Sequence, residues 1–104
     1  MEKIKIEKAD TFCKRLLGLM GRKSLASGYA LMLKPCNSVH MLFMRFSIDV
    51  VFMDKEFRIK KIVRNLKPWS GLAICLDACA VLELNAGEAS RLQLSIGKCI
   101  KDFF

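Results

Sequence analysis

The sequence has no uninterrupted apolar run of the roughly 20 residues that a membrane-spanning helix needs. Its densest apolar stretch, Val39 to Met53, is interrupted by His40, Arg45, Ser47 and Asp49. The N-terminus alternates charged and apolar residues and lacks the apolar segment of a secretory signal. We therefore expect an intracellular protein of the cytoplasm, without a membrane span.

Linker-like sequence is also missing. The chain has two prolines, no low-complexity segment and no internal repeat. Its 104 residues suffice for one domain, and a hydrophobic fraction of 53% argues against disorder because a core can be buried. We therefore expect a single domain over residues 1–104.

An even set of cysteines is absent, because the chain has five. An odd number cannot pair completely within one chain, and reduced thiols are normal in the cytoplasm. Free cysteine usually packs as a small apolar residue. We expect this packing role for Cys13, Cys36, Cys75, Cys79 and Cys99.

Acidic residues are few: the chain has 10 Asp and Glu but 18 Lys and Arg, which gives a net charge of +8. Such a balance suits an anionic partner, which can be nucleic acid, a membrane face or an acidic protein, and it also favours solubility. The basic residues are spread along the chain, with small clusters at Lys14–Arg15, Arg22–Lys23 and Arg58–Lys61. A nucleic-acid partner is therefore one alternative.

Alternation of apolar and polar residues predicts about seven short strands. The segment Phe57–Asn65 alternates and then slips in phase at Lys60–Lys61, which predicts a bulge. Short strands at this density favour a small barrel-like or sandwich-like sheet, because closure protects strand edges. The strands are predicted over Lys3–Ala9, Tyr29–Leu33, His40–Phe46, Ile48–Met53, Phe57–Asn65, Ala80–Leu84 and Lys98–Phe103.

Helical patterns are few. The apolar residues from Phe12 to Gly21 follow helical spacing, and Asp10–Thr11 can cap this helix. A second, shorter helical turn is predicted within Asn85–Leu92. The predicted fold class is therefore mainly β (α+β), with one or two short helices and connecting turns at Pro35–Ser38 and Pro68–Gly71.

Several segments, taken in order, resemble a known family. These are K-R-L-L-G-L-M-G-R from Lys14, S-V-H-M-L-F-M-R-F-S-I-D-V-V-F-M-D from Ser38, N-L-K-P-W from Asn65, V-L-E-L-N-A-G from Val81 and I-G-K from Ile96. Together they cover nearly the whole chain and are similar to the pattern of domain-of-unknown-function family 192. The chain departs from that pattern at Met41, Ser47 and Lys98, where the family variant has Thr, Pro and Asp. The resemblance implies a compact, mainly β domain and no established activity.

Four polar residues lie where the pattern predicts burial: Arg15, His40, Asp49 and Glu83. Buried charges are normally paired, so one interpretation is a structural network of Arg15 with the two carboxylates. The other is the polar floor of a pocket with apolar walls, to which Met41 also contributes. The candidate ligand-binding pocket consists of Arg15, Met20, His40, Met44, Asp49, Trp69 and Glu83.

Catalysis and metal binding would centre on His40, the single histidine. Cys36 and His40 have tolerable metal-ligand spacing and Asp49 could add oxygen, but structural zinc needs four ligands. A nucleophilic Cys36–His40 pair lacks a recognisable oxyanion hole. We therefore predict no metal, cofactor or catalytic residue, and a non-enzymatic domain that binds a small ligand or protein. The alternatives are an enzyme using His40 with Asp49 or Cys36, and a nucleic-acid-associated protein.

Overall fold

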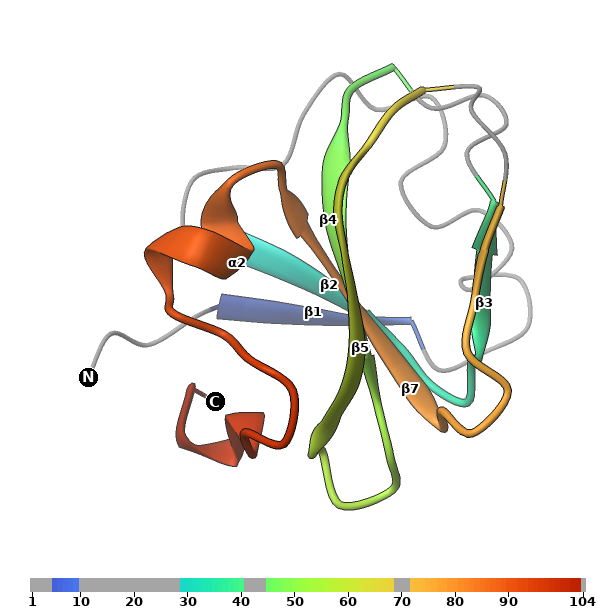
Figure 1. Cartoon of the computed structure of the whole chain (residues 1–104), viewed down its shortest axis with the longest axis vertical. Coiled ribbons are helices and arrows are strands. Elements are labelled where there is room, and N and C mark those ends of the chain that lie inside the picture. The colour runs from blue at the N-terminus through green and yellow to red at the C-terminus, as the bar shows by residue number, and fades with distance from the viewer. Residues whose placement is uncertain (1–4, 10–28, 41–44, 69–71, 104) are drawn as a thin grey trace.

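The computed structural model describes residues 5–9, 29–40, 45–68 and 72–103. Within these ranges the chain forms seven strands and two short helices (Figure 1). They are β1 (Lys5–Ala9), β2 (Tyr29–Leu33), β3 (Ser38–His40), β4 (Ile48–Met53), β5 (Ile59–Leu66), β6 (Leu72–Ile74), β7 (Ala80–Asn85), α2 (Glu88–Arg91) and the 3-10 helix η1 (Ile100–Phe103).

The strands form two sheets. Five strands lie in the order β1-β2-β7-β4-β5, with β1 and β2 parallel and the other pairs antiparallel. β3 and β6 form a separate antiparallel pair, which we call the β3–β6 ribbon. Figure 1 shows the ribbon on one side of the larger sheet and α2 on the other. The mainly β prediction is confirmed, and the described strands are arranged as stacked sheets that do not close into a barrel.

The five-stranded sheet is covered on both faces. All six residues of β4 are buried, which confirms the expectation from its lack of a polar face. On the α2 side, buried residues of the sheet pack with Ala89, Leu92, Leu94 and Ile100; they include Met32, Val51, Met53, Leu82 and Leu84. On the ribbon side, another set packs with Val39 and Ala73; it includes Leu31, Leu33, Ile48, Val50, Phe52 and Val81.

Several predicted elements are confirmed. β1, β2, β4 and β7 match their predicted segments closely, and the short helical turn is α2. β5 pairs with β4 through a register shift between Phe52 and Met53, where Lys60 is the additional residue. The prediction of a bulge at Lys60–Lys61 is therefore confirmed. The additional residue shifts the alternation of side chains between the two faces of the sheet, while β5 stays paired with β4.

Three predictions need correction or fall outside the described residues. The segment Lys98–Phe103 is not a strand: it makes a single bridge, from Cys99 to Arg58, and then enters η1. Of the strand predicted over His40–Phe46, His40 lies in β3, residues 45 and 46 are not in a strand, and residues 41–44 lie outside the described residues. The helix predicted over Phe12–Gly21 lies outside the described residues. In the part of the chain that the structure describes, no helix is long and apolar enough to cross a membrane.

Candidate functional site

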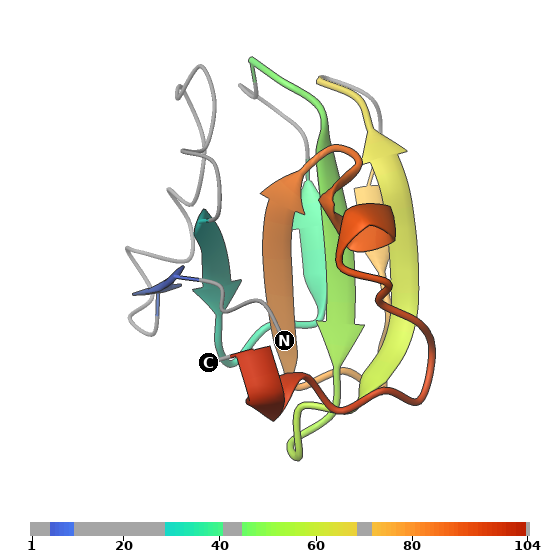
Figure 2. The same cartoon turned by 90° about the vertical axis from the view of Figure 1, so that its left-hand side faces the viewer.

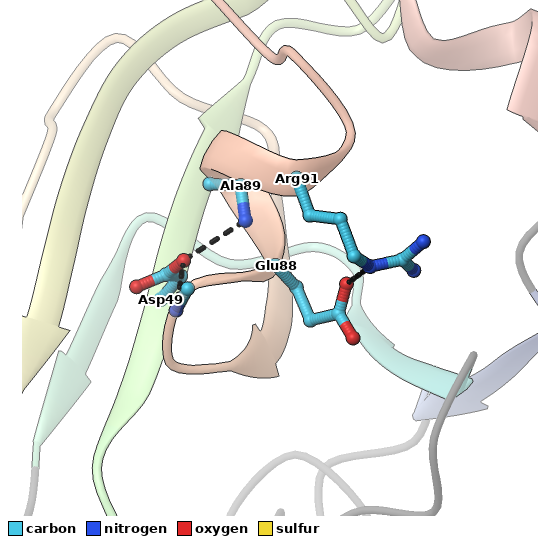
Figure 3. Close-up of polar contacts among 5 residues, drawn as sticks. Asp49, Glu88, Ala89 and Arg91 are labelled. Carbon is cyan, nitrogen blue, oxygen red and sulfur yellow. Dashed lines mark hydrogen bonds and ion pairs between the residues drawn. The ribbon is translucent and has the colours of Figure 1, made fainter.

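Asp49 is the polar centre of the α2 side. It lies on β4 with its side chain 1% exposed, in line with the predicted burial. One carboxylate oxygen, Oδ2, accepts hydrogen bonds from the backbone N–H groups of Gly87 at 3.0 Å and Ala89 at 2.9 Å. The other, Oδ1, accepts one from the N–H of Asn65 at 2.9 Å. We call these four residues the Asp49 cluster, part of which is drawn in Figure 3.

The cluster caps α2 from a distant strand. The first N–H groups of a helix have no partner within the helix, and a Ser, Thr, Asn or Asp at the N-cap usually accepts from them. Here the N-cap is Gly87, which has no side chain and adopts φ 94°. Asp49 supplies the missing acceptor, so β4 holds the first turn of α2 against the sheet. The Oδ2 atom therefore caps α2, while the Oδ1 atom accepts from the N–H of Asn65 in β5.

The exposed side of α2 carries a local ion pair. Glu88 and Arg91 are three positions apart and the Arg91 Nε donates to the Glu88 carboxylate (Figure 3). Exposed pairs of this kind contribute at most about 1 kcal/mol to stability. The Glu88–Arg91 pair therefore contributes little to stability. The buried Asp49 cluster is what attaches α2 to the sheet.

Glu83 is the polar residue of the ribbon side. It lies on β7, is 4% exposed, and is opposite Leu31 of β2 and Val50 of β4. Val50 is in turn opposite Val63 of β5. Residues in direct register share a face of a sheet. Glu83 therefore sits in the middle of an apolar row that faces the β3–β6 ribbon.

Asp49 and Glu83 consequently lie on opposite faces of one sheet. Asp49 is in register with Leu84, the neighbour of Glu83, and successive side chains of a strand point to opposite faces. The prediction that both carboxylates join one network or one pocket floor is wrong for this reason. The same register separates the Asp49 carboxylate from β3, so the structure does not bring it to the strand that carries His40.

The remaining predicted pocket residues are placed only in part. The backbone of His40 pairs with Leu72 at the end of β3, on the ribbon side. Arg15, Met20, Met44 and Trp69 lie outside the described residues. The part of the candidate pocket that the structure describes therefore consists of Glu83 and the ribbon that covers its face.

Backbone hydrogen bonds at one end of the ribbon join Cys36 to Cys79 and Cys75 to Asn37. The Cys36 N–H donates to the carbonyl of Cys79 at 3.1 Å, and the Cys75 N–H donates to that of Asn37 at 2.9 Å. The thiol of Cys36 donates to the carbonyl of Ser38 at 3.1 Å. In the described part of the chain, Cys36, Cys75, Cys79 and Cys99 form no disulfide. Within the described ranges, no three His, Cys, Asp or Glu side chains come close enough together to hold a metal ion.

Sequence reasoning missed the three donors of the Asp49 cluster, Asn65, Gly87 and Ala89, because each contributes a backbone N–H group. A signal was nevertheless present for Asn65 and Gly87, since each lies in a segment that resembles the family. Both adopt positive φ, 53° for Asn65 and 94° for Gly87, which asparagine and glycine tolerate better than other residues. The pattern therefore records backbone conformation at these positions.

The fold and the candidate site define a small α+β domain, in which a five-stranded sheet carries a structural carboxylate on one face and a buried glutamate on the other. The chain belongs to the DUF192 family, described as "Uncharacterized ACR", whose model matches residues 1–101. It is a family of unknown function.

Relatives and solved structures agree with this assignment. A UPF0127 protein of Pyrococcus horikoshii is 41% identical over 98 residues, which cover 91% of this chain and 84% of the relative. A crystal structure of a protein of unknown function from Novosphingobium aromaticivorans matches with a TM-score of 0.82 and 26% identity, covering 90% of this chain and 71% of that one. A "putative transcription regulator" from Sinorhizobium meliloti matches with a TM-score of 0.82 and 28% identity, covering 88% and 76%.

Proposed function

We propose that the protein is a single-domain, non-enzymatic binding protein of the cytoplasm, with its ligand site on the ribbon side of the five-stranded sheet. The main support for this proposal is that Glu83 is buried, with 4% of its surface exposed, in an apolar row beneath the β3–β6 ribbon. Ligand pockets typically combine an apolar lining with a few polar groups that orient the ligand. The proposed site retains Arg15, Met20, His40, Met44, Trp69 and Glu83 and omits Asp49.

The omission of Asp49 also bears on the enzyme hypothesis. A general base must reach the proton that it removes, within hydrogen-bond distance or through one water. The Asp49 carboxylate accepts three backbone hydrogen bonds on the α2 side, while β3 belongs to the ribbon on the other side. This arrangement supports a binding role over a His40–Asp49 catalytic pair.

A thermal-shift screen with a library of small metabolites tests the proposal. A ligand that binds the folded state raises the melting temperature, and above Kd the stabilisation grows with the logarithm of ligand concentration over Kd. We expect at least one compound to stabilise the wild type and to lose that effect in Glu83→Gln, while Asp49→Asn, although less stable, keeps it. The proposal fails if no compound stabilises the wild type, or if the stabilisation is the same in Glu83→Gln.

Nucleic acid is a second candidate partner, favoured by the net charge of +8 and by the name given to the Sinorhizobium meliloti protein. Binding that rests on phosphate contacts weakens steeply as salt rises. A gel-shift titration with duplex DNA and with single-stranded RNA, at low and at physiological salt, tests this candidate. The absence of any retarded species at low salt would exclude it.

A further inference from the structure

An apolar stripe runs along the outside of β6 and the turn that follows it. Leu72 is 63% exposed, Ile74 43% and Leu76 76%, while the intervening Ala73 is buried. Leu72 and Ile74 occupy alternate positions of β6 and so point away from the core that Ala73 joins, and Leu76 is exposed in the turn that follows. Single exposed leucines are common, but adjacent ones form a patch that marks an interaction site.

Positive charge borders this stripe. The segment from Arg58 to Lys67, which contains β5, has five Lys and Arg residues and no Asp or Glu. The Lys61 Nζ donates a hydrogen bond to the backbone carbonyl of Ile74 at 2.9 Å, which puts its ammonium group against the stripe. Lys67, also exposed, follows β5 on the connection that leads toward β6. The Lys61 ammonium group and the exposed aliphatic side chains therefore form one surface.

We propose that this surface, formed by Leu72, Ile74, Leu76 and Lys61, docks on an anionic lipid bilayer. The aliphatic side chains enter the boundary between headgroups and acyl chains, and the Lys61 ammonium group meets the headgroup phosphates. Charge complementarity carries the choice of partner, since a chain of net charge +8 is attracted to a negatively charged leaflet.

Two other occupants fit less well. A second copy of the chain carries the same charge of +8, so two such surfaces repel each other. Nucleic acid is bound through phosphate contacts together with aromatic stacking or polar contacts to the bases. The exposed side chains of the stripe are aliphatic and can neither stack on bases nor hydrogen-bond to them. Acyl chains, in contrast, are a favourable environment for leucine and isoleucine.

Co-sedimentation with vesicles tests the docking. We expect the full chain to sediment with vesicles of phosphatidylglycerol and phosphatidylcholine in equal parts, and to stay in the supernatant with phosphatidylcholine alone. Lys61→Gln should lower the partition coefficient about fivefold, because one lysine near the surface contributes about 1 kcal/mol. The double variant Leu72→Ser/Leu76→Ser should lower it by at least about tenfold, since apolar burial is lost.

Matched controls come from the α2 side. Arg91→Gln makes the same charge change on α2, and Ile96→Ser removes an isoleucine that is 65% exposed in the segment between α2 and η1 (Figures 1 and 2). Both should leave the partition coefficient within about twofold of the wild type, because neither touches the proposed surface. All variants should keep the wild-type circular dichroism spectrum.

Three results would overturn the docking proposal. They are the absence of sedimentation with the anionic vesicles, an equal loss in the control variants, and retardation of duplex DNA or RNA without vesicle binding. The thermal-shift screen around Glu83 reports on a different surface, so either proposal can fail while the other stands.

Discussion

Asp49, Asn65 and Gly87 lie in three separate segments of the family pattern, and the fold joins all three. A buried carboxylate is costly unless hydrogen-bonded, and here three backbone N–H groups at 2.9 to 3.0 Å satisfy it. Hydrogen bonds to a charged group are stronger than neutral ones. The Asp49 cluster therefore ties β4 to β5 and α2, and much of the family pattern records the requirements of the fold.

Replacement of Asp49 by a side chain of the same size should lower the free energy of unfolding. Asp49→Asn keeps the size but turns an acceptor oxygen into an NH₂ group that faces an N–H donor. We expect the free energy of unfolding to fall by about 2–4 kcal/mol, measured by urea denaturation. Asp77→Asn, at an exposed turn position, is the matched control and should change it by less than about 0.5 kcal/mol. Equal stability of Asp49→Asn and the wild type would contradict the structural role.

Asp54 shows the same chemistry at the surface. Its Oδ1 accepts from the N–H of Arg58 at 3.0 Å and of Glu56 at 2.8 Å. The bond from Arg58, then that from Glu56 and the nearby charges of Arg58 and Lys60, lower the pKa of Asp54 below its usual 3.8.

The lowered pKa of Asp54 has a defined consequence for pH dependence. The stability that it contributes is present above the usual pKa of 3.8 and is lost as the pH falls through the lowered value. An NMR titration of the side-chain carboxyl carbon should give a midpoint below 3.8, and Asp54→Asn should remove this part of the acid sensitivity. A midpoint at or above 3.8 would contradict the account.

Burial of individual residues was predictable, but their partners were not. Asp49 and Glu83 stand in apolar strands, and both are buried as expected. The partners of Asp49 are backbone N–H groups, which every residue except proline carries. A sequence therefore indicates that a buried carboxylate needs donors, whereas the donors themselves follow from how the strands and α2 meet.

At the scale of elements, two irregularities among the described residues have local causes. β5 contains Lys60 as an additional residue opposite Phe52 and Met53, and ends near Asn65 at φ 53°. The connection from β7 to α2 turns at Gly87 with φ 94°. Residues with a Cβ atom adopt such positive φ values at a cost, and glycine does so freely.

Gly87→Ala isolates that backbone cost. A Cβ atom at Gly87 would meet no atom within 4 Å, so no steric clash contributes. We expect a loss of about 1–2 kcal/mol in the free energy of unfolding, measured by thermal or urea denaturation. Ser90→Ala, at an exposed position of α2, is the control and should be neutral or slightly stabilising. A neutral Gly87→Ala would mean that the left-handed conformation does not limit this turn.

Element prediction succeeded where the pattern was long and failed where it was short. β4 is a six-residue run of buried residues, and the phase slip located the bulge of β5. β6 has only three residues and lies beside further apolar residues, so alternation gave no boundary. The C-terminal segment has apolar residues suited to a strand, but Gly97 turns the chain at φ 92° and leaves one bridge before η1.

At the scale of the whole molecule, the five-stranded sheet separates two environments. The α2 side contains the Asp49 cluster, and the ribbon side contains Glu83 in an apolar row beneath the β3–β6 ribbon. The sequence pattern predicted that both carboxylates are buried, but not that they lie on opposite faces of the sheet. The face of each side chain depends on the register between β4 and β7, in which Asp49 is opposite Leu84 and not opposite Glu83. We infer that ligand binding belongs to the ribbon side.

Amide NMR of the ¹⁵N-labelled protein, screened against a library of small apolar fragments, tests this division most directly. We expect fragment-induced shift changes at the amides of Glu83, Val50 and the ribbon residues Val39 and Ala73. The amides of Gly87 and Ala89 should keep their positions. Changes that centre on Gly87 and Ala89, with Glu83 and the ribbon unaffected, would contradict it.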